Sequence, residues 1–319
     1  MAGKTLIEWT DRTWNPTRGC SMAKGSEAGG CLNCYAARMA SRGLPGLTSP
    51  TTGRPFARIL DSGPRWTGEV ELIESALILP LKWRKPQRVF VNSMSDLFHE
   101  NLQFEQIKQV WRVMKDADWH TFQILTKRAG RMAELVPYLV DMFGLLPHVH
   151  LGVSVEDKPT ADERISLLLR TPAAKRFVSY EPALGPVDWS PLAYAPKIDT
   201  ADNSVTGWGW LDWIIVGGES GPGARSFNVQ WARNTIRQCR EAGVACFVKQ
   251  LGAYPVIPGH RQAHYDWGPG IGLTESSSRF TAVEPHRESS GLWRIHLNDR
   301  KGGDMSEWPE DLRVRELIK

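Results

Sequence analysis

Residues 88–128, RVFVNSMSDLFHENLQFEQIKQVWRVMKDADWHTFQILTKR, contain the strand–helix–strand pattern that decides the fold class. The apolar runs Arg88–Asn92 and Thr121–Leu125 are short and rich in β-branched and aromatic residues, which is typical of buried strands. Between them, one face of a predicted helix carries apolar side chains at Phe104, Ile107, Val110, Trp111 and Met114. A strand, a helix and a second strand in this order predict parallel pairing through a right-handed crossover.

The same alternation continues toward the C-terminus and sets the expected size of the sheet. Further strands are predicted at His148–Val155, Arg176–Tyr180, Trp213–Val216 and Val244–Val248. Helices are predicted over Ala129–Met142 with an interruption at Pro137, over Pro159–Leu169, and over Val229–Ala242 with Gly243 as its end. These six strands, with a seventh expected before the cysteines, predict an α/β fold. They indicate a partial (β/α)6–7 TIM-like barrel rather than a closed eight-stranded one.

Two stretches interrupt the alternation. Residues 44–68 are rich in Pro, Gly, Thr and Arg, and residues 186–209 form a long irregular segment between two strands. We interpret both as insertions, the second as a lid or a substrate-facing excursion. After Gly252 the chain becomes polar, with a strand-like piece at Gly291–Leu297. We therefore expect a barrel domain at residues 1–252 and a C-terminal extension, residues 253–319, packed on the barrel.

Polar side chains follow each predicted strand. In βα-barrels the active site lies at the C-terminal ends of the strands, because these ends direct several side chains into one space. We therefore predict a site lined by Ser93, Asp96, Lys127, Ser154, Glu156, Ser179, Glu181, Glu219, Lys249 and Gln250. The alternative is that these residues only mark where each strand leaves the core, as in most α/β proteins.

The sequence Gly217-Gly218-Glu219 follows a predicted buried strand. Two glycines there allow a ligand to approach the backbone, and the adjacent carboxylate can hold an amine or a hydroxyl group. The spacing differs from the Gly-x-Gly-x-x-Gly dinucleotide-binding pattern. A tight turn followed by a capped helix is the alternative interpretation.

Composition narrows the class of protein. The net charge of the 319-residue chain is only +4, which permits nucleic-acid binding without indicating it. No run of residues has the apolar length of a membrane span or the pattern of a signal peptide, so we expect a cytoplasmic protein with reduced thiols. The 14 tryptophans indicate either core packing or a surface on which bases stack.

Three of the five cysteines lie close together, as Cys20-x10-Cys31-x2-Cys34. A structural zinc site would need a fourth ligand, and the nearest histidine is His99. Three thiolates on a four-iron cluster leave one iron open to a small molecule. Zinc with a remote fourth ligand and three unligated structural cysteines remain alternatives. Cys239 and Cys246 are predicted to be buried apolar residues.

A set of short motifs resembles a largely uncharacterised family of phage and bacterial proteins that has a three-Cys motif and is similar to the radical S-adenosylmethionine (SAM) superfamily. The motifs cover most of residues 5–305. They are Ile7–Asp11, Thr13–Pro16, Gly19-Cys20, Cys31–Ala36, Ser93–Phe98, Leu125–Arg128, Gly152–Glu156, Ser179–Pro182, Val216–Gly221, Val248–Gly252 and Lys301–Asp304. Unlike the superfamily pattern Cys-x3-Cys-x2-Cys, the first gap has ten residues, Asn33 precedes the last cysteine, and the Gly-Gly-Glu element comes late in the chain.

The resemblance implies a 4Fe–4S cluster on Cys20, Cys31 and Cys34, with SAM on the open iron. It implies reductive cleavage of SAM to a 5′-deoxyadenosyl radical and an electron donor such as flavodoxin or ferredoxin. We assign cofactor binding to Ser93, Asp96, Lys127, Ser154, Ser179, Gly217, Gly218, Glu219 and Gln250. The candidate catalytic residues are Glu156, Glu181 and Lys249.

Three functions are compatible with these residues. The first is a radical-SAM-like enzyme that acts on a nucleic acid or nucleotide, as a DNA-repair lyase of the photoproduct kind or in base modification. Basic pairs such as Lys127-Arg128 and the many aromatic residues support this substrate class. The second is a metal-stabilised nucleic-acid-binding protein without redox chemistry. The third is a hydrolase that uses the strand-end carboxylates and Lys249.

Overall fold

The computed structural model describes residues 2–25, 29–43, 46–189, 210–259, 280–285 and 291–318. Its main sheet has eight strands in the order β1-β2-β7-β8-β9-β10-β11-β13, which from β2 onward is also their order along the chain. The pairs β2–β7, β7–β8, β8–β9 and β11–β13 are parallel, and only β1 is shown to pair antiparallel, with β2. The predicted α/β fold, a partial TIM-like barrel of parallel strands, is confirmed.

The chain divides into two compact units, and we describe each by itself. Unit 1 comprises residues 1–154, 162–178 and 195–211, and unit 2 comprises residues 155–161, 179–194 and 212–319. Strands β9 and β10 and helix α5 contain residues of both units. The proposed boundary between residues 252 and 253 stays a prediction.

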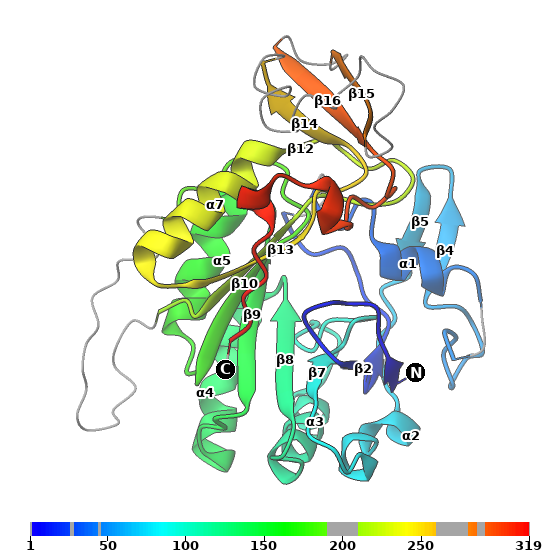
Figure 1. Ribbon diagram of the computed structural model, residues 1–319. Coiled ribbons are helices and arrows are strands. Elements are labelled where there is room, and N and C mark those ends of the chain that lie inside the picture. Colours follow the sequence, from blue (N-terminus) through cyan, green and yellow to red (C-terminus); the bar gives the residue numbers. More distant parts are fainter. Residues whose placement is uncertain are drawn as a thin grey trace. The chain divides into compact units, whose positions relative to one another are not determined.

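The elements that begin in unit 1 include the first six strands of the main sheet (Figure 1). The strands are β1 (Ala2–Lys4), β2 (Arg12–Trp14), β3 (Thr17–Arg18), β4 (Ala57–Leu60), β5 (Gly63–Trp66), β6 (Glu71–Leu72), β7 (Arg88–Val91), β8 (Thr121–Thr126), β9 (Val149–Val155) and β10 (Lys175–Tyr180). The helices are α1 (Tyr35–Ala40), α2 (Glu74–Leu77), the 3-10 helix η1 (Pro80–Lys82), α3 (Phe104–Asp116), α4 (Ala129–Phe143) and, running into this unit, α5 (Lys158–Arg170).

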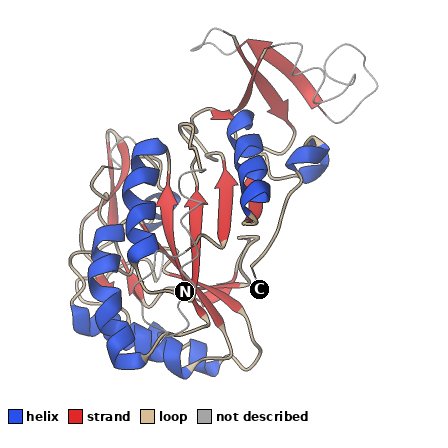
Figure 2. Cartoon of the chain, turned by 90° about the vertical axis from the view of Figure 1, so that its left-hand side faces the viewer, coloured by secondary structure: helices blue, strands red, loops and turns tan. Residues whose placement is uncertain are grey.

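Unit 2 contains the last strands of the main sheet and a second sheet of four strands in the order β12-β14-β16-β15 (Figure 2). Its strands are β11 (Trp213–Gly217), β12 (Phe227–Asn228), β13 (Ala245–Gln250), β14 (Pro255–Pro258), β15 (Phe280–Pro285) and β16 (Leu292–Leu297). Its helices are α7 (Val229–Ala242) and the 3-10 helices η2 (Met305–Glu307) and η3 (Glu310–Leu312).

Strand β9 shows why the centre of the sheet is closely packed. All seven of its residues are buried, as expected of a parallel strand that is covered on both faces. A Cβ atom at Gly152 would lie 2.5 Å from Cζ of Phe177 on β10. The Phe177 ring therefore fills the space above Gly152, and Trp9 lies near the same ring with a centroid distance of 6.3 Å.

Local signals fix the ends of the helices. Gln103 and Gln106 form a reciprocal capping box at the start of α3. Asn228 accepts a hydrogen bond from the Gln230 amide at the start of α7, and Gly243 ends that helix with a φ of 67°. Helix α4 is continuous through Pro137, so the predicted interruption there is wrong. Its backbone tolerates the proline within a 15-residue helix.

The C-terminal residues of unit 2 cover the edge of β13. The Val248 amide donates to the Val314 carbonyl at 2.8 Å, and the Glu316 amide donates to the Cys246 carbonyl at 2.9 Å. The Glu316 carbonyl accepts from Trp213 Nε1 at 2.9 Å. This segment therefore satisfies backbone groups on the last strand of the main sheet.

The structure describes the predicted insertions in part. The hairpin β4–β5 lies beside α1 within the first one (Figure 1). Residues 44–45 of that insertion and 190–209 of the second lie outside the described residues. The strand expected at Gly291–Leu297 is β16. Among the described residues, no helix has the length and apolar character needed to cross a membrane.

Candidate functional site

The three clustered cysteines lie in unit 1 after the short strand β3 and before helix α1. Cys34 is the residue that precedes the first turn of α1, and all three cysteines are partly buried and form no disulfide. Gly19 has a φ of +89°, and a Cβ atom there would lie 2.0 Å from the Glu69 carbonyl oxygen. Only glycine therefore fits the turn that leads into Cys20.

The thiol of Cys20 lies beside a positive charge. Arg128 Nη1 is 3.8 Å from Cys20 Sγ, and the thiol donates to the Ser21 carbonyl at 3.2 Å. Burial raises the pKa of Cys20 to about 12, Arg128 acts in the opposite direction, and Cys34 and Cys31 raise the pKa further.

The donor set suits iron or zinc in its chemistry, because both metals bind thiolates. Within the residues that the structure describes, no three His, Cys, Asp or Glu side chains are already gathered as a metal site. The three thiols therefore have the ligand chemistry of a metal centre and lie in the same part of unit 1. Metal binding would bring the three sulfur atoms together and displace the thiol protons.

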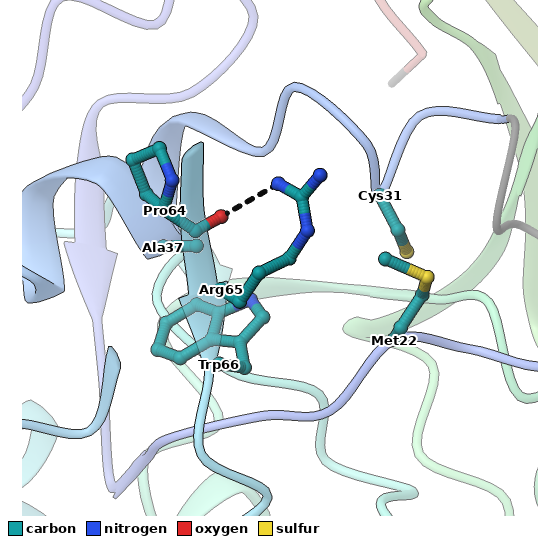
Figure 3. A pocket seen from close by; sticks show the side chains of 6 residues that line it. All are labelled: Met22, Cys31, Ala37, Pro64, Arg65 and Trp66. Atoms are coloured by element: carbon teal, nitrogen blue, oxygen red, sulfur yellow. Dashed lines mark hydrogen bonds between the residues drawn. The ribbon is translucent and has the colours of Figure 1, made fainter. Parts of the chain in front are cut away.

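A cavity of about 40 Å³ opens at Cys31 and is lined by Met22, Cys31, Ala37, Pro64, Arg65 and Trp66. In Figure 3 the sulfur atoms of Met22 and Cys31 point toward each other. Arg65 Nη1 donates to the carbonyls of Pro64 and Leu32, at 2.9 and 3.2 Å. The cavity has room for only about three water molecules, so it is too small to be a nucleotide pocket.

Asp96, predicted to bind a cofactor, is buried and fully engaged by its own unit. It accepts hydrogen bonds from Thr126 Oγ1 at 2.7 Å, from the Phe98 amide at 3.0 Å, and from the Lys127 amide and Arg128 Nη1, each at 3.1 Å. These donors fix the carboxylate at the end of β8. Its observed role is therefore to anchor Arg128 and the residues that follow β8.

Three further predicted residues of unit 1 lie at strand ends. Ser93 donates to Asn15 Oδ1 at 3.2 Å, and the Ser154 carbonyl accepts from the buried Arg164 at 2.8 Å. Lys127 is partly exposed, whereas Arg128 is buried. Of the basic pair that supports a nucleic-acid substrate in the sequence, Arg128 therefore directs its charge into the protein, toward Asp96.

His99 is a residue of this cluster that sequence reasoning considered only as a distant zinc ligand. Its Nε2 atom lies 2.8 Å from Ser21 Oγ, and its Nδ1 atom accepts from the Asn101 amide at 3.1 Å. The proton is therefore on Nε2, which donates to Ser21. Burial, followed by the charge of Arg128, lowers the pKa of His99 to about 4. The spacing of 79 residues between Cys20 and His99 gave no signal of this proximity.

Unit 2 brings together a second group of predicted residues around Glu181. Its Oε1 atom accepts from Lys249 Nζ at 2.6 Å and from Gln250 Nε2 at 3.2 Å. Gln250 Nε2 also donates to the Gly218 carbonyl at 2.9 Å. The side chains of Lys249 and Glu181 are 20% and 18% exposed, so this ion pair is reachable by solvent.

Glu219 is occupied by a neighbour in the sequence. Arg225 donates to Glu219 Oε2 from its amide and from Nε, each at 2.9 Å, and to Oε1 from Nη2 at 2.8 Å. The carboxylate thus closes the turn between the two residues. A Cβ atom at Gly218 would lie 2.5 Å from the Leu251 carbonyl oxygen, and the loop backbone fills that space. This supports the tight-turn interpretation of the Gly-Gly-Glu element.

The remaining predicted residues of unit 2, Glu156 and Ser179, are buried. The Glu156 amide donates to Thr160 Oγ1 at 2.9 Å, and its carbonyl accepts from the Leu184 amide at 2.7 Å. Cys239 and Cys246 are each only 2% exposed, which confirms that they are buried. The assignment of cofactor-binding and catalytic roles to the individual residues stays a prediction.

Residues 4–290 match a protein family described as "Protein of unknown function (DUF5131)". A search of curated proteins finds no match. Among solved structures, spore photoproduct lyase complexed with dinucleoside spore photoproduct has 10% sequence identity and a TM-score of 0.43, covering 98% of this chain and 75% of that chain. A mutant of that lyase with bound AdoMet and dinucleoside spore photoproduct has 9% identity and a TM-score of 0.43 at the same coverage.

Proposed function

We propose that this chain, which belongs to the family described as protein of unknown function (DUF5131), is a radical-SAM-like iron–sulfur enzyme that acts on a nucleic acid or nucleotide. The observation that carries the proposal is the group of three cysteines outside disulfides, Cys20, Cys31 and Cys34, in the unit that holds the first parallel strands. Three thiolate ligands leave one iron of a 4Fe–4S cluster open, which suits SAM as a second cofactor. Reductive cleavage of SAM would supply the radical, with an electron from a donor such as flavodoxin or ferredoxin.

Different residues of the chain would bind the cluster and act on the substrate. The three cysteines would hold the cluster, and the buried Arg128 would keep Cys20 in place. In unit 2, Lys249 and Glu181 form an accessible charged pair that could hold or move a proton on a bound substrate. Glu219 is engaged by Arg225, which argues against a role for its carboxylate in binding an amine.

The substrate class and the reaction are part of the same proposal. DNA repair of the photoproduct-lyase kind, or base modification, is proposed from the resemblance of the motifs. Among the tryptophans that the structure describes, only Trp119 is exposed, with an exposed fraction of 39%. Most of the others therefore contribute to packing rather than to base stacking. A cytoplasmic location is proposed because none of the five cysteines forms a disulfide.

Anaerobic reconstitution of the full chain with iron and sulfide tests the proposal. We expect the visible absorbance of an iron–sulfur cluster, an electron paramagnetic resonance (EPR) signal on reduction that changes when SAM is added, and formation of 5′-deoxyadenosine. Cys239→Ser, which alters a buried thiol outside the trio, should leave the absorbance unchanged. A protein that takes up zinc alone and never binds iron would contradict the proposal.

A second candidate function is a metal-stabilised nucleic-acid-binding protein without redox chemistry. His99 favours it, because an imidazole lies beside the segment that carries Cys20 and is a ligand type that zinc accepts. This function predicts DNA binding that weakens with salt and survives Glu181→Gln. The enzyme predicts that Glu181→Gln abolishes turnover while the protein remains folded.

A further inference from the structure

Arg128 is a buried arginine immediately after strand β8. Its side chain is only 5% exposed. It is not among the residues that the sequence analysis assigns to metal binding, cofactor binding or catalysis. A guanidinium group is stable in such a place only if its donors are satisfied by acceptors, because an unpaired buried charge is costly.

The three nitrogen atoms of the guanidinium contact three different residues, which lie in two segments of unit 1: the loop after β7 and the segment that carries Cys20. Nε donates to Glu100 Oε2 at 2.7 Å, and Nη1 donates to Asp96 Oδ2 at 3.1 Å. Nη2 donates to Ser21 Oγ at 2.9 Å and to the Ser21 carbonyl at 3.2 Å. The planar fork of arginine suits this arrangement, whereas a lysine ammonium is a single point of charge.

Both partners of the Ser21 hydroxyl are rigidly supported. Asp96, which holds Arg128, is itself fixed by Thr126 and by two backbone amides. His99, which donates to Ser21, accepts from the Asn101 amide. The segment that carries Cys20 is therefore held against the ends of β7 and β8 by two buried side chains.

We propose that Arg128 is a positioning residue: it holds residues 20–21 so that the Cys20 sulfur is presented as the first ligand of the metal centre. This inference rests on the proposed function, because it assigns Arg128 to the same thiol site. The positive charge 3.8 Å from Cys20 Sγ also offsets the negative charge that thiolate ligands bring to the centre.

Hydrogen–deuterium exchange of the metal-free full chain tests the positioning role directly. In Arg128→Met the amides of residues 19–23 should exchange at least about tenfold faster, because several charge-assisted hydrogen bonds to this segment are lost. Arg128→Lys should resemble Arg128→Met, because lysine keeps the charge but cannot contact Asp96, Glu100 and Ser21 at the same time. Ser21→Ala, which removes only the hydroxyl group, should show a smaller increase of about threefold.

Arg237→Met is the matched control, because Arg237 is 57% exposed and pairs with Glu241 on the surface of α7. It should leave exchange over residues 19–23 unchanged. Unchanged exchange in Arg128→Lys and Ser21→Ala, with both variants folded by circular dichroism, would overturn the proposal even if Arg128→Met failed to fold.

The iron content of the reconstituted protein provides the second readout. Arg128→Lys should bind less than about half the iron of the original chain, in line with typical losses for residues that orient metal ligands. Full iron binding in Arg128→Lys would overturn the positioning role. If the original chain itself binds no iron, the proposed function fails, whereas the exchange experiment still decides whether Arg128 holds the Cys20 segment.

Discussion

The charged cluster around Arg128 in unit 1 and the one around Glu181 and Glu219 in unit 2 use the same residue types in different ways. Arg128 is buried and joins segments that are 107 residues apart, from Ser21 to the end of β8. Arg225 pairs with Glu219 only six residues away, and the Lys249–Glu181 pair is partly exposed. The first cluster therefore fixes a distant loop, while the second closes a local turn and keeps one ion pair accessible.

Substitution of cysteines is expected to give the largest difference between the two units, measured as iron–sulfur absorbance. Cys20→Ala, Cys31→Ala and Cys34→Ala should each abolish the iron–sulfur absorbance, because a cluster cannot retain its geometry on two protein thiolates. Cys246→Ala in unit 2 should retain it. Iron and sulfide analysis after reconstitution measures both results. If all three single variants still bind a cluster, the cysteines of unit 1 are no more important for cluster binding than those of unit 2.

The next largest effect is expected on the free energy of unfolding, when glycines that pack closely are replaced by alanine. Gly218→Ala should lower the free energy of unfolding by about 2–3 kcal/mol, because its Cβ atom would lie 2.5 Å from the Leu251 carbonyl oxygen, and backbone yields less readily than a side chain. Gly152→Ala, which meets the Phe177 ring in unit 1, should cost less, and Gly130→Ala, with open space around it, should cost nothing. Urea unfolding compares the three variants, and an equal cost at positions 152 and 218 would contradict this ranking.

We expect His99 in unit 1 to make a larger contribution to the pH dependence of stability than the charged cluster of unit 2. The pKa of His99 is lowered to about 4 in the folded protein, so the unfolded chain takes up the proton first as the pH falls. Stability is complete above the ordinary histidine pKa of about 6.5 and decreases as the pH falls toward 4, by about 1 kcal/mol between pH 7.5 and 5.5.

His99→Gln should reduce this difference, because glutamine can still donate to Ser21 but does not titrate. Thermal unfolding of the metal-free protein at the two pH values measures it. An identical pH dependence in the variant would show that His99 is not the group responsible.

The smallest effect is expected for the accessible ion pair of unit 2. Lys249→Met should lower the free energy of unfolding by only about 0.5 kcal/mol, since partly exposed pairs stabilise little and Gln250 continues to donate to Glu181. Urea unfolding tests this value. A loss of about 3 kcal/mol or more would mean that Glu181 behaves as a buried charge and that the two clusters are alike.

Regular elements could be predicted from the sequence where periodicity and end signals agree. The predicted helix with apolar positions from Phe104 to Met114 is α3, Phe104–Asp116, and the helix predicted at Val229–Ala242 has the same bounds as α7. The predicted strands of the main sheet are also present, with ends shifted by one or two residues. The hairpin β4–β5 was not predicted, because its exposed Ile59 and Leu60 lack the alternation of a half-buried strand.

The candidate site could be predicted only where its residues are close in the sequence. The three cysteines and the Glu181 group follow from short motifs and from the rule that strand ends carry polar residues. Arg128 and His99 were missed as partners of the Cys20 segment, because their contacts depend on which loop the fold brings to the end of β8. Arg128 also follows Lys127, and the pair in isolation indicates a surface patch rather than a buried tether.

The segment that lies along β13 has a consequence for how the protein behaves in concentrated solution. An uncovered edge strand offers its free amides and carbonyls to any other strand, and it is a common starting point for self-association. Through the hydrogen bonds of Val314 and Glu316, the last strand of the main sheet is closed to such pairing. A tag or truncation that displaces these residues would thus be expected to promote aggregation while leaving the thiol site of unit 1 untouched.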